Sequence, residues 1–304
     1  MNIRQKKMRR TTAGQHSWAY TPLLLLALLF FSSCGVLLPG TSLKPAATPP
    51  VVTMQPIQAP HQAYITIAVG LDISGSYPRF VFEQAKRGVA DSIDRLVQPN
   101  EDGATVYVNW ITDNSWSPDS TAMPPIVIPA LPADPAEPTL QPAPTPTGDP
   151  YQDAQATKAV RAYNARTLAN YYALLQQNHA QLALVRSQVK RQTDTLRRLE
   201  PPVDTIGTDI YGFVERASQR LHGMQGIRIL VLATDLDNND LSQQVQGGMH
   251  LKHVRVRVIF HYCQHAPVCA RNDAQWQQVF QQAGSTDIRF FDPGQSLAAP
   301  NLFS

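Results

Sequence analysis

The residues best suited to chemistry in this chain carry oxygen atoms and stand in three separate segments. Each segment lies beside an expected strand or helix, and together they contribute Asp72, Ser74, Ser76, Thr208 and Asp235. Hydroxyl and carboxylate oxygens are hard ligands that suit Mg²⁺, with Mn²⁺ or Ca²⁺ as alternatives. Because only two of the five are acids, the ion keeps part of its charge. The set therefore predicts a metal site that an external carboxylate can complete.

Strands that alternate with helices must position these residues. The apolar run 64–71 is typical of a buried parallel strand, and Pro78 opens a helix with the apolar stripe Phe80, Phe82, Ala85, Val89, Ile93 and Leu96. We expect further strands at 104–111, 125–131, 227–234, 254–262 and 287–291, and helices at 210–221, 241–246 and 273–283. This order predicts an α/β fold with a doubly wound, mostly parallel sheet. Ligands of such sheets bind beyond the carboxyl ends of the strands, where the oxygen-bearing residues stand.

The order Asp72-x-Ser74-x-Ser76, then Thr208, then Asp235 resembles the metal-ion-dependent adhesion site of von Willebrand factor type A domains. The resemblance covers about 62–131 and 201–291 and implies the Rossmann-like fold of that family. It also implies that the two serines and the threonine contact the ion. The first aspartate is then held near the ion, often through water, and the later one joins directly or through water.

Three features depart from the family pattern. Leu236 follows the later aspartate, where the family usually has glycine, and Tyr77 adds bulk that could screen the site. The third departure is a long insertion before Thr208, which separates the first part of the domain (62–131) from the second (201–304).

The insertion combines a linker with a long helix. Eleven prolines occur between Pro118 and Pro150, and 132–150 reads as a proline-rich linker. In 151–200 apolar residues recur at seven-residue steps, a coiled-coil-like seam formed by Leu168, Leu175, Leu182, Val189 and Leu196. The seam can pack on its own domain, or it can pair with a second copy or a partner through 151–199. A third alternative breaks the helix into a hairpin.

The N-terminal segment predicts export. Basic residues fill 1–10, the apolar run PLLLLALLFF occupies 22–31, and Phe31-Ser-Ser-Cys34-Gly resembles a bacterial lipobox in which Cys34 is lipidated. An uncleaved anchor helix and simple secretion are the alternatives. We therefore expect a signal peptide or anchor at 1–33 and a proline-rich tether at 34–61, with the body outside the cytoplasm and anchored to the cell membrane.

Charge argues against a nucleic-acid protein. Five of the 26 basic residues fall within the first ten positions, and without them 21 basic and 23 acidic residues leave a balance of −2. A nucleic-acid-binding domain carries its basic residues on the folded part of the chain.

Cys263 and Cys269 stand six positions apart. In an exported protein this spacing favours a disulfide, while a zinc site with His261 and His265 and a pair of free thiols are the alternatives. If Cys34 carries lipid and Cys263 pairs with Cys269, all three cysteines of the chain have a role.

The sequence predicts a binding protein and not an enzyme. It contains no GxSxG, HExxH, P-loop or glycine-rich dinucleotide motif. We expect a membrane-tethered, extracytoplasmic von Willebrand A domain that binds a protein partner through a divalent metal. The alternative is a structural or assembly lipoprotein, in which the long helix mediates oligomerisation or partner docking and the metal site is vestigial.

Overall fold

The computed structural model describes residues 64–99, 102–202, 207–238 and 248–304. The chain divides into units 1–56 and 57–304, and all described residues belong to the second. The signal peptide, Cys34, the tether and the helix expected at 241–246 lie outside the described residues. No helix within the described ranges is long and apolar enough to cross a membrane.

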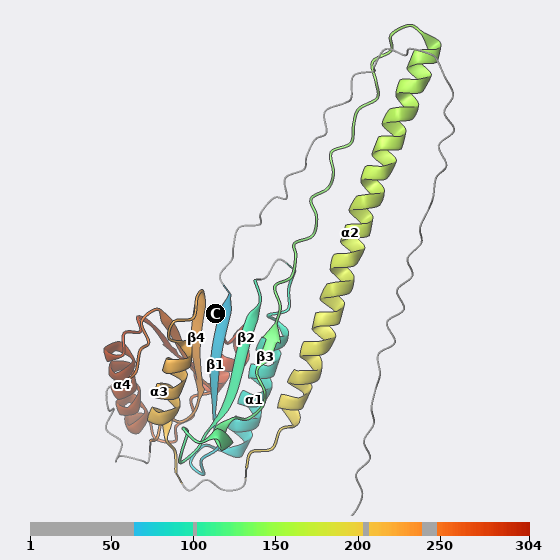
Figure 1. Cartoon of the computed structure of the whole chain (residues 1–304). Coiled ribbons are helices and arrows are strands. Elements are labelled where there is room, and N and C mark those ends of the chain that lie inside the picture. The colour runs from blue at the N-terminus through green and yellow to red at the C-terminus, as the bar shows by residue number, and fades with distance from the viewer. Residues whose placement is uncertain (1–63, 100–101, 203–206, 239–247) are drawn as a thin grey trace, which may run out of the picture. The chain divides into compact units, whose positions relative to one another are not determined.

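A six-stranded sheet in the order β3-β2-β1-β4-β5-β6 forms the centre of the described unit (Figure 1). Its strands are β1 Ile65–Asp72, β2 Ala104–Ile111, β3 Ile126–Ile128, β4 Ile227–Ala233, β5 Val254–Ile259 and β6 Asp287–Phe290. The short strand β3 runs antiparallel to β2, and every other pairing is parallel. Strand β1 therefore lies between β2 and β4, and the three carboxyl ends meet at one edge of the sheet.

Helices cover both faces of the sheet, which confirms the predicted α/β class. One face is covered by α1 (Arg79–Asp94), α2 (Pro150–Arg198) and α5 (Pro293–Ala298), and the other by α3 (Ile210–Leu221) and α4 (Ala266–Gln282). A 3₁₀ turn, η1, spans Pro118–Ser120. Side chains alternate along β1, so that Ile67 and Val69 enter the core under α1 while Ala68 enters the core under α3.

Three local predictions need correction. The stripe of α1 includes the buried Val81, whereas Phe80 is 60% exposed. Helix α4 begins at Ala266 and not at 273. Pro267 is favoured in the first turn of a helix. The early turns were not predicted because they are exposed and carry no apolar stripe. The sequence analysis did not predict α5, whose six residues bury only Ser296.

Helix α2 is one continuous helix of 49 residues, and its seam packs on its own unit. The hairpin alternative is therefore wrong. Near the end of α2, Arg197 pairs with Asp91 and Asp94 of α1 at 2.7 and 2.6 Å. The buried Lys86 of α1 donates to the Leu199 carbonyl oxygen at 2.8 Å. Three apolar seam residues join the core under α1, namely Val185, Val189 and Leu196.

The proline-rich segment 132–149 lies alongside the first part of α2 (Figure 1). Hydrogen bonds of 2.8–2.9 Å join Ala133 to Asn178, Gln141 to Asn164 and Thr147 to Asp153. An extended polyproline chain of 14 residues spans about 43 Å, and a helix of 25 residues spans about 38 Å. Because the two lengths nearly match, the extended segment can run beside the helix over its whole length. We call 132–149 together with 150–178 the arm.

The period of the proline-rich segment explains which side faces α2. Pro135, Pro138 and Pro144 are partly buried, while most of their neighbours are exposed. A polyproline helix has three residues per turn, so residues spaced by multiples of three share one side. The segment predicted as a linker is thus a structured partner of the seam.

Truncating Leu196 should test whether the end of α2 belongs to the core. Leu196 is fully buried, so Leu196→Ala should lower the free energy of unfolding by about 2–5 kcal/mol. Leu184→Ala, at a position 57% exposed on the same helix, should change it by less than about 0.5 kcal/mol. Urea unfolding measures both, and equal effects would contradict packing of α2 on its own unit.

Candidate metal centre

Asp72 ends the central strand β1 and is fully buried. Its Oδ1 accepts a hydrogen bond from the Ser74 backbone N–H at 2.8 Å, and its Oδ2 accepts one from the Thr234 hydroxyl at 2.7 Å. The carboxylate is therefore held from the loop after β1 and from the end of β4. Its orientation is fixed before any ligand arrives.

Asp235 brings a second carboxylate to the same edge of the sheet. It follows β4, is only 8% exposed, and its Oδ1 accepts from the Asp237 backbone N–H at 3.0 Å. Burial raises the pKa of Asp235. Burial, and then the charge of Asp235, raise the pKa of Asp72 from 3.8 to about 7. Two buried carboxylates whose negative charges interact favour the binding of a cation, which compensates both charges.

The two predicted serines join the carboxylates. Ser74 Oγ and Ser76 Oγ lie 3.1 Å apart, and the Ser76 side chain forms a hydrogen bond with Asp235. Asp72, Ser74, Ser76 and Asp235 are thus linked by direct interactions. Four of the five predicted metal ligands form one cluster.

Thr208, the fifth predicted ligand, is fully buried, and among the described residues its hydroxyl has no hydrogen-bond partner. A buried hydroxyl without a partner costs about 1–3 kcal/mol, so such groups are rare in folded proteins. An ion that takes a hard oxygen ligand would satisfy this atom. The donor set therefore fits a divalent cation.

Neighbours of Thr208 fasten the start of α3 to the sheet edge. The Asp209 N–H donates to the Thr112 carbonyl oxygen at 2.7 Å, which ties α3 to the loop after β2. The Ile210 N–H donates to Asn238 Oδ1 at 2.8 Å, which ties it to the loop after β4. Since β2 and β4 flank β1, these two bonds tie the residues that follow Thr208 to the edge of the sheet at which Asp72 stands.

Sequence reasoning missed Thr234 and Asp209, which position the site without belonging to the predicted ligand set. Asp209 Oδ1 accepts from the Gly212 N–H at 2.7 Å and caps α3, and Asp209 Oδ2 accepts from the Ser115 N–H. The available signal was an aspartate at a helix start, which is a preferred cap. The only sequence signal for Thr234 was its position directly before Asp235.

Leu236 adopts the left-handed backbone region, with φ of 61°. Glycine is favoured there, which gives a physical reason for the glycine usual at this position in the family that the motif resembles. The strained leucine is held from three sides: its side chain is buried, its N–H donates to Thr234 Oγ1, and its carbonyl accepts from Trp276 Nε1 at 3.1 Å. The backbone at this departure thus keeps the shape that a glycine would give.

Tyr77 does not stand in front of the site. Its ring is 4% exposed in the core, and its hydroxyl donates to the Phe260 carbonyl oxygen at 3.0 Å. Burial, followed by the charges of Asp72 and Asp235, raises the pKa of Tyr77 well above its ordinary value. The side chain is therefore buried in the core near the two carboxylates, which does not support the expected screening of the site.

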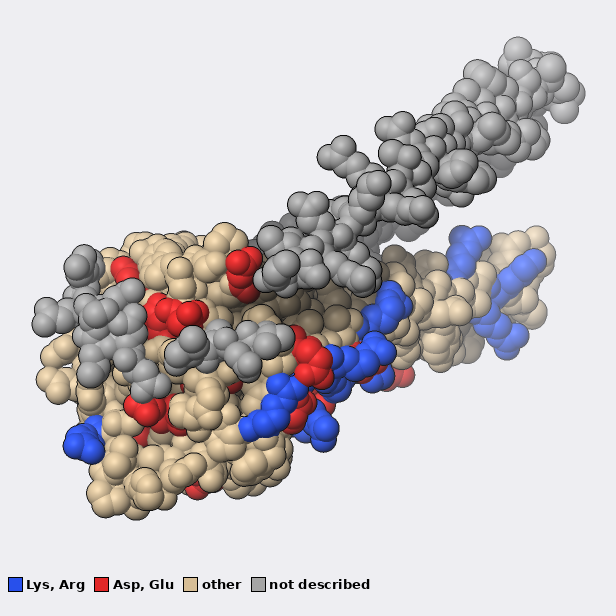
Figure 2. Space-filling model, turned by 90° about the horizontal axis from the view of Figure 1, so that it is seen from below, with Lys and Arg blue, Asp and Glu red and all other residues tan. Residues whose placement is uncertain are grey.

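The surrounding surface is acidic. Viewed toward the carboxyl ends of the strands, Asp and Glu side chains gather in the middle of the face, while most Lys and Arg lie toward α2 (Figure 2). Among the described residues no cluster of three or more His, Cys, Asp or Glu side chains could hold a metal. A metal at this edge would therefore rely on hydroxyl ligands beside the two acids.

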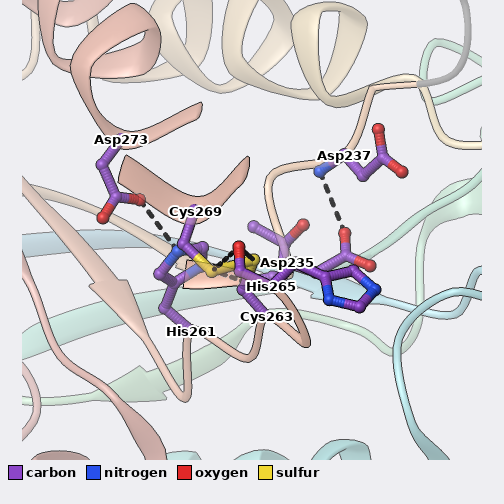
Figure 3. The surroundings of a disulfide bond; sticks show 8 residues. Asp235, Asp237, His261, Cys263, His265, Cys269 and Asp273 are labelled. Carbon is purple, nitrogen blue, oxygen red and sulfur yellow. Dashed lines mark hydrogen bonds and ion pairs between the residues drawn. A yellow bond between two sulfur atoms is a disulfide. The ribbon is translucent and has the colours of Figure 1, made fainter. Parts of the chain in front are cut away.

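Cys263 and Cys269 form a disulfide beside the site (Figure 3). Both sulfurs are used in this bond, so the structure contradicts the zinc and free-thiol alternatives. His261 does not face the cysteines as a ligand. Its Nε2 lies 2.8 Å from the Asp273 carboxylate, and its Nδ1 lies 3.2 Å from the Thr234 carbonyl oxygen.

A scan against models of protein families and a search of curated proteins both find no match to this chain.

Replacing Asp72 by asparagine should make the metal-free protein less sensitive to pH. Because the folded pKa of about 7 exceeds the unfolded value of 3.8, Asp72 stabilises the fold at low pH, and this contribution is lost as pH rises toward about 7. The amide of the Asp72→Asn variant could still accept from the Ser74 N–H and donate to Thr234 Oγ1. In EDTA at about pH 8, urea unfolding should show this variant to be more stable than the parent chain.

The same measurement at about pH 4.5 should show a smaller difference or the reverse order. If both proteins lose stability equally between the two pH values, Asp72 does not carry the raised pKa.

Proposed function

We propose that this chain is an extracytoplasmic domain of the von Willebrand A type that binds a protein partner through Mg²⁺. Two buried carboxylates, Asp72 and Asp235, that interact after the neighbouring strands β1 and β4 are the observation that carries the proposal, and the buried Thr208 hydroxyl, which has no hydrogen-bond partner among the described residues, supports it. Mn²⁺ or Ca²⁺ would suit the same oxygen donors. The left-handed backbone at Leu236 supports the family assignment, because the family's glycine position keeps its conformation here.

The residues of the site would have two roles in binding the ion. Ser74, Ser76 and Thr208 would offer neutral hydroxyl oxygens to the ion, while Asp72 and Asp235 would supply the negative charge. A bound ion would supply a coordination position for a carboxylate oxygen of the partner protein. Thr234 and the Ser74 N–H hold Asp72 in place throughout. Since the sequence carries none of the catalytic motifs named above, we infer a binding site and not a catalytic one.

We further propose that the N-terminal segment tethers this domain to the cell membrane. The support is the basic stretch 1–10, the apolar run 22–31 and the lipobox-like sequence that ends at Cys34. The proline-rich tether at 34–61 would then hold the domain off the membrane surface.

Removing the Thr208 hydroxyl should weaken metal binding without harming the fold. Thr208→Val keeps the side-chain shape and removes an unpartnered polar atom, so the free energy of unfolding in EDTA should stay equal or rise. Calorimetric titration of the full chain with Mg²⁺ should show heat for the parent chain and at least about a tenfold weaker affinity for Thr208→Val. Asp72→Ala should show no heat.

Thr195→Val is the matched control, because Thr195 is exposed on α2, a helix that contributes no residue to the site. It should bind Mg²⁺ like the parent chain. Unchanged affinity in both Thr208→Val and Asp72→Ala would refute the proposed site.

A second candidate function is oligomerisation or partner docking through the arm. The arm exposes five large apolar side chains, Leu140, Tyr151, Tyr163, Tyr172 and Leu174, and no residue of α2 before Asn178 is buried. Such side chains on a long helix are typical of a surface that meets another protein. Under this reading the arm mediates oligomerisation or partner docking.

Deleting the arm separates the two functions. Residues 135–176 can be replaced by a short glycine-serine turn, because Asn178 Nδ2 donates to the Ala133 carbonyl oxygen at 2.9 Å and so holds the two ends together. The core residues Val185, Val189 and Leu196 remain. If the arm drives assembly, sedimentation should show self-association of the full chain that the deletion loses, with Mg²⁺ affinity unchanged. Equal sedimentation of the two chains would exclude self-assembly through the arm.

A further inference from the structure

A cavity of about 290 Å³ opens directly beside the candidate metal centre. Two of the predicted metal ligands, Ser76 and Asp235, line one side of it. The connection between β5 and α4 also lines it, with Tyr262, the disulfide cysteine Cys263 and His265, and Figure 3 shows Cys263 and His265 near Asp235. Anything bound at the metal would therefore have this cavity next to it.

The volume of the cavity limits what it can hold. Pockets for complete small ligands usually measure about 300–1,000 Å³, so this one is at the lower limit. It is better suited to one side chain of a larger molecule. Because a protein partner reaches the metal through one carboxylate, a neighbouring residue of the partner is the group in reach.

The lining of the cavity favours an aromatic side chain. Val268 and Tyr262 give it apolar walls, and the ring of Tyr262 packs edge-on against the exposed Phe80 at 5.9 Å between centroids. The disulfide adds polarizable sulfur, which contacts aromatic rings favourably. The carboxylate of Asp237 lies at the same cavity and offers the competing possibility of a cationic side chain.

Two cross-links hold the wall in place. The disulfide joins the end of β5 to the first turns of α4, and the pair His261–Asp273 joins the same two elements at 2.8 Å (Figure 3). Residues 264–268 between them are exposed, so burial does not hold this stretch. The shape of the cavity therefore depends on these cross-links.

We propose that this cavity is a specificity subsite, closed by the disulfide, for an aromatic side chain next to the metal-bound carboxylate of the partner. The partner would then present a segment in which an acidic residue adjoins a Phe, Tyr or Trp. This inference rests on the proposed metal-dependent function, and it adds the residues that select the partner.

Three short peptides supply the first test with the full chain and saturating Mg²⁺. Acetyl-Phe-Glu-Gly-amide and acetyl-Gly-Glu-Phe-amide present the ring on either side of the carboxylate, and acetyl-Gly-Glu-Gly-amide lacks it. At least one phenylalanine peptide should bind about tenfold more tightly than the glycine peptide, measured by NMR titration. Equal affinities, no binding, or tighter binding of the matching lysine peptides would overturn the proposal.

Variants of α4 supply the matched control. Val268→Lys places a charge in the cavity and should remove the preference for phenylalanine. Gln277→Lys adds the same charge nine residues later, on the opposite side of the helix, and should leave the preference intact. The same loss in both variants would mean that the cavity does not select the side chain.

The double variant Cys263→Ser with Cys269→Ser tests the cross-link. It should bind Mg²⁺ like the parent chain but discriminate less between the peptides, with faster amide hydrogen exchange in 262–269. A preference unchanged from the parent would show that the disulfide does not shape the subsite. If the parent chain itself binds no Mg²⁺, the proposed function fails first; Mg²⁺ binding without peptide selectivity rejects the subsite alone.

Discussion

The burial of two carboxylates at the end of the central strand is the constraint on which this structure depends. Asp72 is fully buried and Asp235 nearly so, and burial, followed by the charge of Asp235, raises the pKa of Asp72 to about 7. The hydrogen bonds from Thr234 and Ser74 offset this cost only in part. A protein that keeps two like charges in its interior gains most when a cation binds between them. Among the described residues, the buried hydroxyl of Thr208 is a further polar group without a hydrogen-bond partner.

Much of the surrounding structure holds the loops of this edge in place. Asp209 and Asn238 fasten the start of α3 to the loops after β2 and β4. Leu236 is kept in a left-handed conformation by Trp276 and Thr234, a strain that persists only because neighbours fix it. The disulfide similarly holds the connection between β5 and α4, whose residues 264–268 are exposed. The site is thus rigid before any ligand binds.

The arm shows how one helical seam can serve two partners within a chain. Toward its end, α2 packs apolar residues on α1, and Lys86 and Arg197 add polar contacts. Before Asn178, α2 instead faces a proline-rich chain in which the described residues form no backbone–backbone hydrogen bonds with one another. Asn178 and Asn164 of α2 supply donors and acceptors to this chain. Each asparagine thus has a physical role on the side of α2 that faces the proline-rich segment.

The sequence by itself determined the sheet, the long helix and the types of residue at the site. Apolar runs such as 64–71 and the seven-residue period of 151–200 reflect which side chains share a face, and that property is local. Tertiary structure alone decided what covers each face: the seam packs on α1 and on the proline-rich segment, Phe80 is exposed, and Tyr77 is buried. It also decided that Thr208 lacks a hydrogen-bond partner among the described residues and that a cavity lies beside Asp235. The reason is that the contacts of a side chain depend on segments distant in sequence, which spacing along the chain does not record.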